Sequence, residues 1–286
     1  MKRFIEFLKK QPLLTGILGV TFIGGCIRVL GPRMVGDFEA GAIRLAFALS
    51  GAVFLYLISR EKAFEKSDNK TFYVMLVLIP TLFFPLFISI TQLANNIINK
   101  TPLADNWFIS ILIITFEYFC VGLVEEITSR GLINDSILYQ FRNSKISTKK
   151  LFIIIAIADV IVFGAIHLIG SNFSSSTAAI LGIIKTLSSG IGGLAYLFLY
   201  WKTRNLWAVS IMHGLFDYIL DIPVVLFRQV GEVASTTQDY VGMQGSDVTS
   251  AIIVQSVVIL IDIIICVWIW KKHMKDVDFE EIRQTW

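Results

Sequence analysis

Long apolar runs separated by short polar connections make up most of this sequence. A helix needs about 20 mostly apolar residues to cross the hydrocarbon core of a bilayer. Because backbone polar groups cannot stay unpaired in lipid, each run of this length predicts a membrane-spanning helix. Eight such runs extend over residues 13–30, 42–59, 72–91, 107–124, 151–169, 178–200, 206–222 and 251–270.

Positive charge alternates along the connections between these runs. The basic segments are the N-terminus, 60–70, 142–150, 202–204 and 271–275. The intervening connections are neutral or of mixed charge, and they cover 33–39, 100–105, 171–177 and 228–247. Cytoplasmic loops of membrane proteins carry an excess of lysine and arginine. The pattern therefore predicts eight spans with both termini in the cytoplasm.

Composition supports a polytopic membrane protein. Hydrophobic residues make up 55% of the 286 residues, charged residues only 16%, and the mean hydropathy is +0.70. A soluble domain carries about a quarter charged residues. We therefore expect one all-α transmembrane domain over 1–286, with an uncleaved first span and the lipid bilayer as its solvent. The net charge of +3 is spread over short clusters between spans and does not indicate nucleic-acid binding.

Ionisable side chains inside membrane spans are costly and therefore indicate function by default. Arg44 and Asp262 lie near span ends, which favours an interfacial position for their side chains. The three cysteines lie far apart within apolar runs, which is typical of small core residues. The ionisable set is Arg28, Arg44, Glu117, Glu125, Glu126, Asp159, His167, Lys185, His213, Asp217 and Asp262.

The first cluster of these residues holds two adjacent glutamates. Glu126 and Arg130 are four residues apart with the glutamate first, the favourable orientation for a helical ion pair. Glu125 lies about 140° around the helix from Arg130 and cannot easily share that partner. A free carboxylate in an apolar site can act as a general base. The alternative is an ordinary helix end with solvated charges.

Two further clusters each place a histidine on an apolar helix. Phe163 lies one turn from His167 on the same face, and Gly164 permits close helix approach. His213 and Asp217 form another pair four residues apart. The alternatives are a histidine bonded to a neighbouring helix and a local His–Asp pair. At 1.5 Å per residue, Glu125 and His167 each lie about 25 Å along their helices from the basic connection at 142–150. His213 lies only about 13 Å along its helix from Arg204.

Together these motifs resemble the CAAX-protease and bacteriocin-processing family, which includes Ras-converting endopeptidases and bacterial self-immunity proteins. The resemblance covers a core of 107–223. It implies an intramembrane endopeptidase of eight helices whose site opens toward the cytoplasm. By this likeness Glu125 and His167 activate water, Glu126 and Arg130 hold their helix in position, and His213 and residue 217 stabilise the oxyanion. Phe163 would line the substrate pocket.

Residue 217 departs from the asparagine common among relatives that process prenylated proteins. Asp217 could donate to an oxyanion only when protonated, or it could orient His213, so both the oxyanion role and a prenylated substrate are in question. Zinc is a second open point: Glu125, His167 and His213 would suit a catalytic zinc site. The same groups suit metal-free activation of water, which we favour because Arg130 lies near any cation beside Glu126.

Other chemistries fit the sequence less well. A His-Glu-x-x-His motif and a Gly-x-Gly-Asp motif are both absent. The remaining alternatives are a non-catalytic immunity or scaffold protein of the same family and an ion-coupled transporter that uses Glu117, Asp159 and Lys185. The leading interpretation is a peptidase of the bacterial plasma membrane that acts on a membrane-associated peptide or protein.

Overall fold

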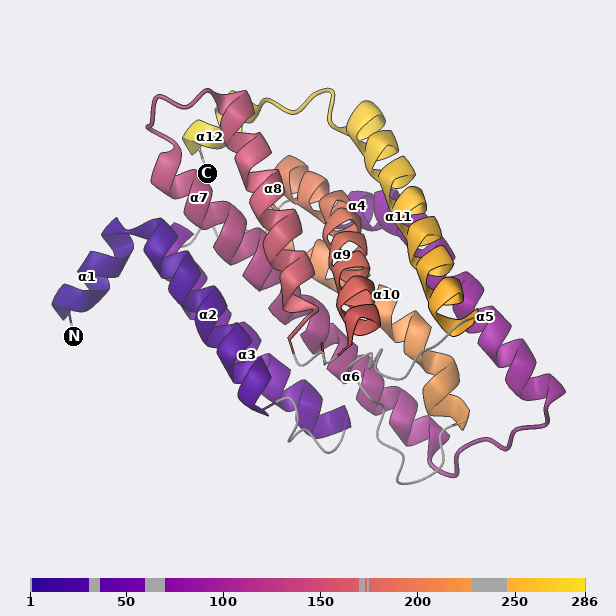
Figure 1. Cartoon of the computed structure of the whole chain (residues 1–286). Coiled ribbons are helices and arrows are strands. Elements are labelled where there is room, and N and C mark those ends of the chain that lie inside the picture. The colour runs from indigo at the N-terminus through magenta and orange to yellow at the C-terminus, as the bar shows by residue number, and fades with distance from the viewer. Residues whose placement is uncertain are drawn as a thin grey trace.

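The chain forms a bundle of long helices (Figure 1). The computed structural model describes residues 2–30, 37–59, 70–169, 173, 175–227 and 246–285, and these ranges contain no strand. Seven helices within them are long and apolar enough to cross a membrane. The predicted polytopic helix bundle is thereby confirmed.

The elements follow one another in a simple order. The first part of the bundle comprises α1 (Lys2–Lys10), α2 (Pro12–Leu30), α3 (Asp37–Ser59), α4 (Lys70–Leu78), the 3₁₀ turn η3 (Ile79–Leu82) and α5 (Phe83–Ile98). The second part comprises α6 (Trp107–Glu126), the π-helix η4 (Ile127–Asp135), α7 (Ser136–Phe141), α8 (Thr148–Ile166), α9 (Ser176–Thr203), α10 (Leu206–Phe227), α11 (Ser246–His273) and α12 (Phe279–Thr285).

Helix α8 lies at the fifth predicted span, 151–169, and is not one of these seven helices. Its 19 residues are long enough to cross the hydrocarbon core. It carries three charged residues, Lys149, Lys150 and Asp159. The fourth predicted span is longer than its apolar run, because α6, η4 and α7 form one continuous 35-residue segment from Trp107 to Phe141. A π-helical stretch inside a long helix is frequent at functional sites.

Glycines bring the backbones of the central helices into contact. A Cβ atom on Gly122 of α6 would lie 2.1 Å from the carbonyl oxygen of Ser210 in α10. A Cβ atom on Gly164 of α8 would lie 2.3 Å from the carbonyl oxygen of Thr186 in α9, as the sequence predicts for a close helix approach. Small residues at such crossings increase the packing between membrane helices. Helix α6 therefore packs closely against α10, and α8 packs closely against α9.

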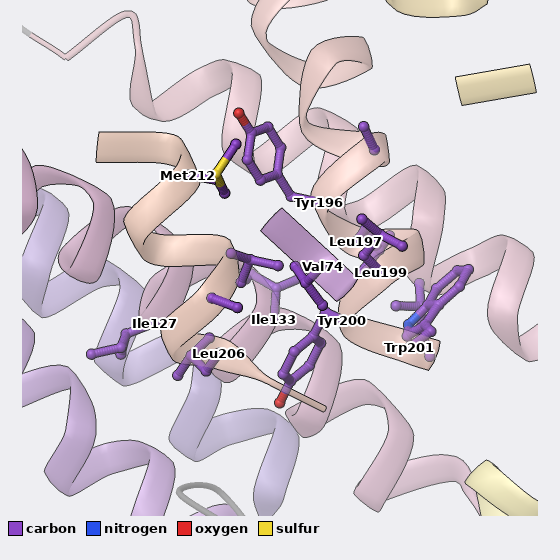
Figure 2. Packing of buried hydrophobic residues seen from close by; sticks show 14 of the residues in the cluster. Val74, Ile127, Ile133, Tyr196, Leu197, Leu199, Tyr200, Trp201, Leu206 and Met212 are labelled. Carbon is purple, nitrogen blue, oxygen red and sulfur yellow. The ribbon is translucent and has the colours of Figure 1, made fainter. Parts of the chain in front are cut away.

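The hydrophobic core lies toward the end of the bundle that carries the α7–α8 connection. Every residue from 126 to 138 is buried. Figure 2 shows part of one buried cluster, which includes Ile127 and Ile133 of η4, Tyr196, Tyr200 and Trp201 of α9, and Leu206 of α10. These contacts join the segment after the paired glutamates to the helices that follow it in sequence.

The C-terminal segment closes the same end. Arg283 of α12 donates hydrogen bonds to the carbonyl oxygens of Arg142, Ser144 and Ile146 at 2.6–2.8 Å. Its side chain is buried although the surrounding helix is polar. The ring of Phe279 packs against Phe152 and Trp201. Helix α12 thus binds the α7–α8 connection to the ends of α8 and α9.

Substitution of Gly122 by alanine should destabilise the protein by about 1–3 kcal/mol, because the new methyl group meets backbone rather than a movable side chain. Gly25→Ala is the matched control, since a Cβ atom there has nothing within 4 Å. Thermal unfolding in detergent measures both. Equal midpoints for the two variants would contradict the close crossing of α6 and α10.

Candidate functional site

The three sequence clusters meet at one point inside the bundle. Glu125 and Glu126 end α6, His167 caps the C-terminus of α8, and His213 lies in the buried first half of α10. The Glu125 Oε2 atom lies 3.6 Å from His167 Nε2 and 3.5 Å from His213 Nε2. One carboxylate oxygen therefore faces both imidazoles.

Glu125 has the free carboxylate that the sequence predicts. Its Oε2 atom is buried and has no hydrogen-bond partner among the described residues. A buried acceptor without a partner is unfavourable by roughly 1–3 kcal/mol. The arrangement therefore favours a small hydrogen-bond donor at this oxygen, in the space that it shares with the two Nε2 atoms.

Local backbone contacts fix the orientation of the His167 ring. Its Nδ1 atom lies 2.8 Å from the carbonyl oxygen of Phe163, one turn earlier in α8. A carbonyl oxygen only accepts, so Nδ1 carries the proton and donates. In the neutral ring Nε2 then holds the lone pair and faces Glu125.

Glu126 belongs to a buried network of polar side chains. Its Oε2 atom lies 3.1 Å from Arg130 Nε, which is the ion pair predicted from their spacing. Its Oε1 atom lies 2.8 Å from His213 Nδ1. Glu126 therefore joins two motifs, since it contacts the arginine of its own helix and the histidine of α10.

Arg130 is the most highly connected side chain of this network. It is fully buried, donates to the carbonyl oxygen of Gly193 at 2.5 Å, and lies 3.8 Å from Asp159. Its guanidinium group also stacks on the Phe163 ring, 4.6 Å from the centroid. The cation therefore lies between two buried carboxyl groups, those of Glu126 and Asp159.

His213 is surrounded by acids. Beyond Glu126 and Glu125, its Nε2 atom lies 3.8 Å from Asp217 Oδ2, one turn further along α10. The Asp217 side chain is 28% exposed, compared with 8% for His213. Asp217 is thus close to the imidazole but too far for a direct hydrogen bond.

The depth of His213 differs from the sequence expectation, and the reason is the position of Arg204. Arg204 adopts a left-handed conformation with φ of 51° between α9 and α10, and it donates to the buried Asp135 at 3.0 Å. The connection between α9 and α10 is therefore tied to the buried Asp135 of η4. His213 is nine residues from Arg204 and Glu125 is ten residues from Asp135, so the two side chains meet.

Phe163 contacts the site residues themselves. Its buried ring lies 4.9 Å from the His167 ring and 5.6 Å from the His213 ring, measured between centroids. The Arg130 guanidinium group also stacks on this ring. Phe163 therefore packs against three of the candidate site residues. Its place in a substrate pocket stays a prediction.

Two further carboxylates in the spans have arginine partners. Arg44 forms a largely buried ion pair with Glu117 of α6. Two residues named for a transporter path are thus in ion pairs, Glu117 with Arg44 and Asp159 with Arg130. The contact of Asp159 with Arg130 was not predicted from the sequence. The two residues lie on different helices, and spacing along one helix reveals only contacts within that helix. The interfacial position expected for Arg44 and Asp262 stays a prediction.

The histidines and Glu125 offer the ligand types of a zinc site. Both imidazoles bind through Nδ1 to other groups and direct Nε2 toward Glu125, an orientation that also occurs in metal-binding histidines. Within the described ranges, however, no group of three His, Cys, Asp or Glu side chains has the arrangement of a metal site. The geometry brings the candidate ligands together without assembling a metal centre.

Arg130→Ala should destabilise the protein by about 3–5 kcal/mol, because it leaves Glu126 and Asp159 buried without their cation. Lys149→Ala is the control, because it removes the charge of an exposed side chain. Combining Arg130→Met with Glu126→Gln and Asp159→Asn should recover part of the stability, because no uncompensated charge remains. Thermal unfolding in detergent tests this, and a stable Arg130→Ala variant would refute the charge balance.

The comparisons with known proteins agree with the three motifs. Residues 106–219 match the model of a family described as type II CAAX prenyl endopeptidase Rce1-like. No curated protein and no solved structure matches the chain. The matched segment contains Glu125, Glu126, Arg130, Phe163, His167, His213 and Asp217. Residues 106–219 are therefore similar to the Rce1-like CAAX prenyl endopeptidases, and the family resemblance carried by the three motifs is confirmed.

Proposed function

We propose that this protein is an intramembrane endopeptidase in which Glu125 and His167 activate a water molecule. The observation that supports the proposal best is the buried, unpartnered Oε2 atom of Glu125, which faces the Nε2 atoms of both histidines. A water molecule there could donate one proton to Glu125 and the other to the lone pair of His167. Its oxygen would then be positioned for attack on a peptide carbonyl.

The reaction follows from these hydrogen bonds. The water oxygen bonds to the scissile carbonyl carbon while its proton moves to Glu125, and the carbonyl oxygen becomes an oxyanion. The tetrahedral intermediate then collapses, the C–N bond breaks, and the proton passes to the departing amine. Removing a positioned general base slows such reactions by about 100-fold to 10,000-fold.

His213 is the candidate for stabilising the oxyanion. The three carboxylates of Glu125, Glu126 and Asp217 around it balance the charge of an imidazolium, whose Nε2–H can donate to the developing negative charge. Asp217 can donate only when protonated, so its role is either a second donor or the orientation of His213. Glu126 and Arg130 hold His213 and the end of α6 in place.

We propose that the reaction proceeds without a metal. Glu126, the second carboxylate beside the histidines, is already bonded to Arg130 and His213, and the guanidinium group disfavours a cation nearby. If zinc were held, Glu125, His167 and His213 would hold it, and the metal would polarise the attacking water. The substrate is a membrane-associated peptide or protein, and a bacterial plasma membrane is the proposed location.

Glu125→Gln and His167→Ala should each reduce peptide cleavage by about 100-fold or more, because each removes a proton acceptor for water. Asp262→Asn is the control, since it alters a carboxyl group on α11 that forms no ion pair with Glu125 or His167. The assay uses purified protein in liposomes with a quenched fluorescent peptide that ends in a prenylated CAAX sequence, followed by mass spectrometry of peptide libraries.

Cleavage that survives both substitutions at normal protein levels would refute the peptidase proposal. A cellular phenotype that survives them while cleavage is lost would instead assign the biological role to a non-catalytic immunity or scaffold function. Loss of solute flux on changing Asp159 or Lys185, with cleavage absent in the unmodified chain, would favour a transporter.

Chelator treatment tests the metal separately. Protein purified without chelator should contain no stoichiometric zinc, and its cleavage rate should be unchanged after dialysis against a strong chelator. His213→Ala protein serves as the comparison for zinc content. Zinc at one equivalent that is lost in His213→Ala, together with loss of activity on chelation, would replace the metal-free mechanism.

A further inference from the structure

Helix α1 departs from the direction of the bundle although it directly precedes a membrane span. In Figure 1 it projects outward from the start of α2, whereas α2 runs along the other helices. Helix α2 begins at Pro12 and is long and apolar enough to cross a membrane. Residues 2–10 therefore adjoin one end of the first span.

Pro12 and Thr15 explain the change of direction. Proline has no backbone N–H, so residue 12 cannot donate to the carbonyl oxygen of Leu8, as an uninterrupted helix requires. That oxygen instead accepts from the backbone N–H of Gln11 at 3.0 Å and from the Thr15 hydroxyl group at 2.8 Å. The Thr15 side chain is fully buried. Hydrogen bonds within the protein thus fix the joint between α1 and α2.

The start of α2 lies at the end of the bundle that carries the basic α7–α8 connection, which we call the basic end. The backbone N–H of Leu13 donates to Gln140 Oε1 of α7 at 3.4 Å. A Cβ atom on Gly16 would lie 2.5 Å from the Cβ atom of Ser136, also in α7. The connection 142–150 directly follows α7. The charge pattern predicts that this end, and α1 with it, lies on the cytoplasmic side.

Apolar and charged side chains lie on opposite faces of α1. At 3.6 residues per turn, its apolar residues lie within about 160° of the helix circumference, and the remaining arc carries only charged residues. The apolar residues are Phe4, Ile5, Phe7 and Leu8, and the charged ones are Lys2, Arg3, Glu6, Lys9 and Lys10. A basic amphipathic helix of this kind is typical of a membrane surface.

Protein covers only part of the apolar face of α1. Leu8 is 5% exposed, and α1 contacts α2 and α3. Phe4 and Phe7, however, are 60% and 49% exposed. They lie one turn apart, so the two rings form one apolar surface beside the first span. Exposed apolar side chains continue along α2, for example at Ile17, where lipid is the solvent of a membrane span.

The charged face of α1 is cationic and open. Arg3 and Lys10 are exposed and form no ion pair with the residues that the structure describes. Lys9 is paired with Glu6 of the same helix at 3.4 Å, and both side chains remain accessible. Clusters of lysine and arginine next to the cytoplasmic end of a span attract anionic lipids. Lipid phosphates thus supply the charge that complements this face.

We propose that α1 is an interfacial anchor that binds anionic lipids of the cytoplasmic leaflet. Phe4 and Phe7 enter the boundary between headgroups and acyl chains, while the cationic side chains of the opposite face meet lipid phosphates. The bend at Pro12 turns α1 along the membrane surface instead of continuing the span. This role does not depend on the proposed peptidase function.

Spin labelling of the full chain in vesicles tests the anchor. Cys26, Cys120 and Cys266 are first replaced by alanine. A nitroxide label is then attached to Phe4→Cys on the apolar face or to Glu6→Cys, the matched control on the opposite face. The protein is reconstituted into vesicles of phosphatidylethanolamine with phosphatidylglycerol, or of phosphatidylcholine alone. Collisions with oxygen and with a water-soluble nickel chelate report whether each label lies in lipid or in water.

In the anionic vesicles the Phe4→Cys label should collide mainly with oxygen and the Glu6→Cys label mainly with the chelate. Replacing Arg3, Lys9 and Lys10 together by glutamine should raise chelate collisions at the Phe4→Cys label several-fold, because the electrostatic attraction is lost. Vesicles of phosphatidylcholine alone should have the same effect.

Three results would overturn the proposal. Equal access of the chelate to both labels in anionic vesicles would place α1 in water. A Phe4→Cys label that collides with neither reagent would show that a protein partner or a second copy of the chain covers it. Access that changes neither with lipid charge nor with the glutamine substitutions would exclude recognition of anionic headgroups.

Discussion

The buried guanidinium group of Arg130 is the contact on which the rest of this site depends. A charge in the interior of a membrane protein is tolerated only when it is paired and hydrogen-bonded. Arg130 meets this condition through Glu126, Asp159, the carbonyl oxygen of Gly193 and the ring of Phe163. These partners come from three different elements, so satisfying one side chain fixes the relative positions of α6–η4, α8 and α9.

The same contact gives two neighbouring glutamates different chemistry. Glu126 is committed to Arg130 and His213, and through them it transmits the position of α6 to α10. The Oε2 atom of Glu125 faces the Nε2 atoms of His167 and His213 and has no hydrogen-bond partner among the described side chains. An adjacent pair of identical residues thus provides one structural group and one group that is available for reaction.

Closure of one end of the bundle has a related physical basis. Asp135, Arg204 and Arg283 are charged groups that are buried at or near the basic end, and each is bound by several partners. Such networks tie the connections 142–148 and 203–205 to the helices beside them. Helix α8 ends on the other side at His167, where the side chains of His167 and Asp217 are 22% and 28% exposed.

The sequence by itself determined the class of fold and the local chemistry. Apolar length predicts the helices because lipid leaves the backbone no other partners, and helical spacing predicts the Glu126–Arg130 pair because both residues lie on one turn. Tertiary structure decided what no single helix contains. It places Asp159 against Arg130, pairs Arg44 with Glu117, and brings His213 to the depth of Glu125. That last position could not be predicted from residue counts, because they assume that Arg204 marks the membrane surface. Arg204 is instead largely buried and forms an ion pair with the buried Asp135, a contact between α9–α10 and η4 that the spacing within one helix does not reveal.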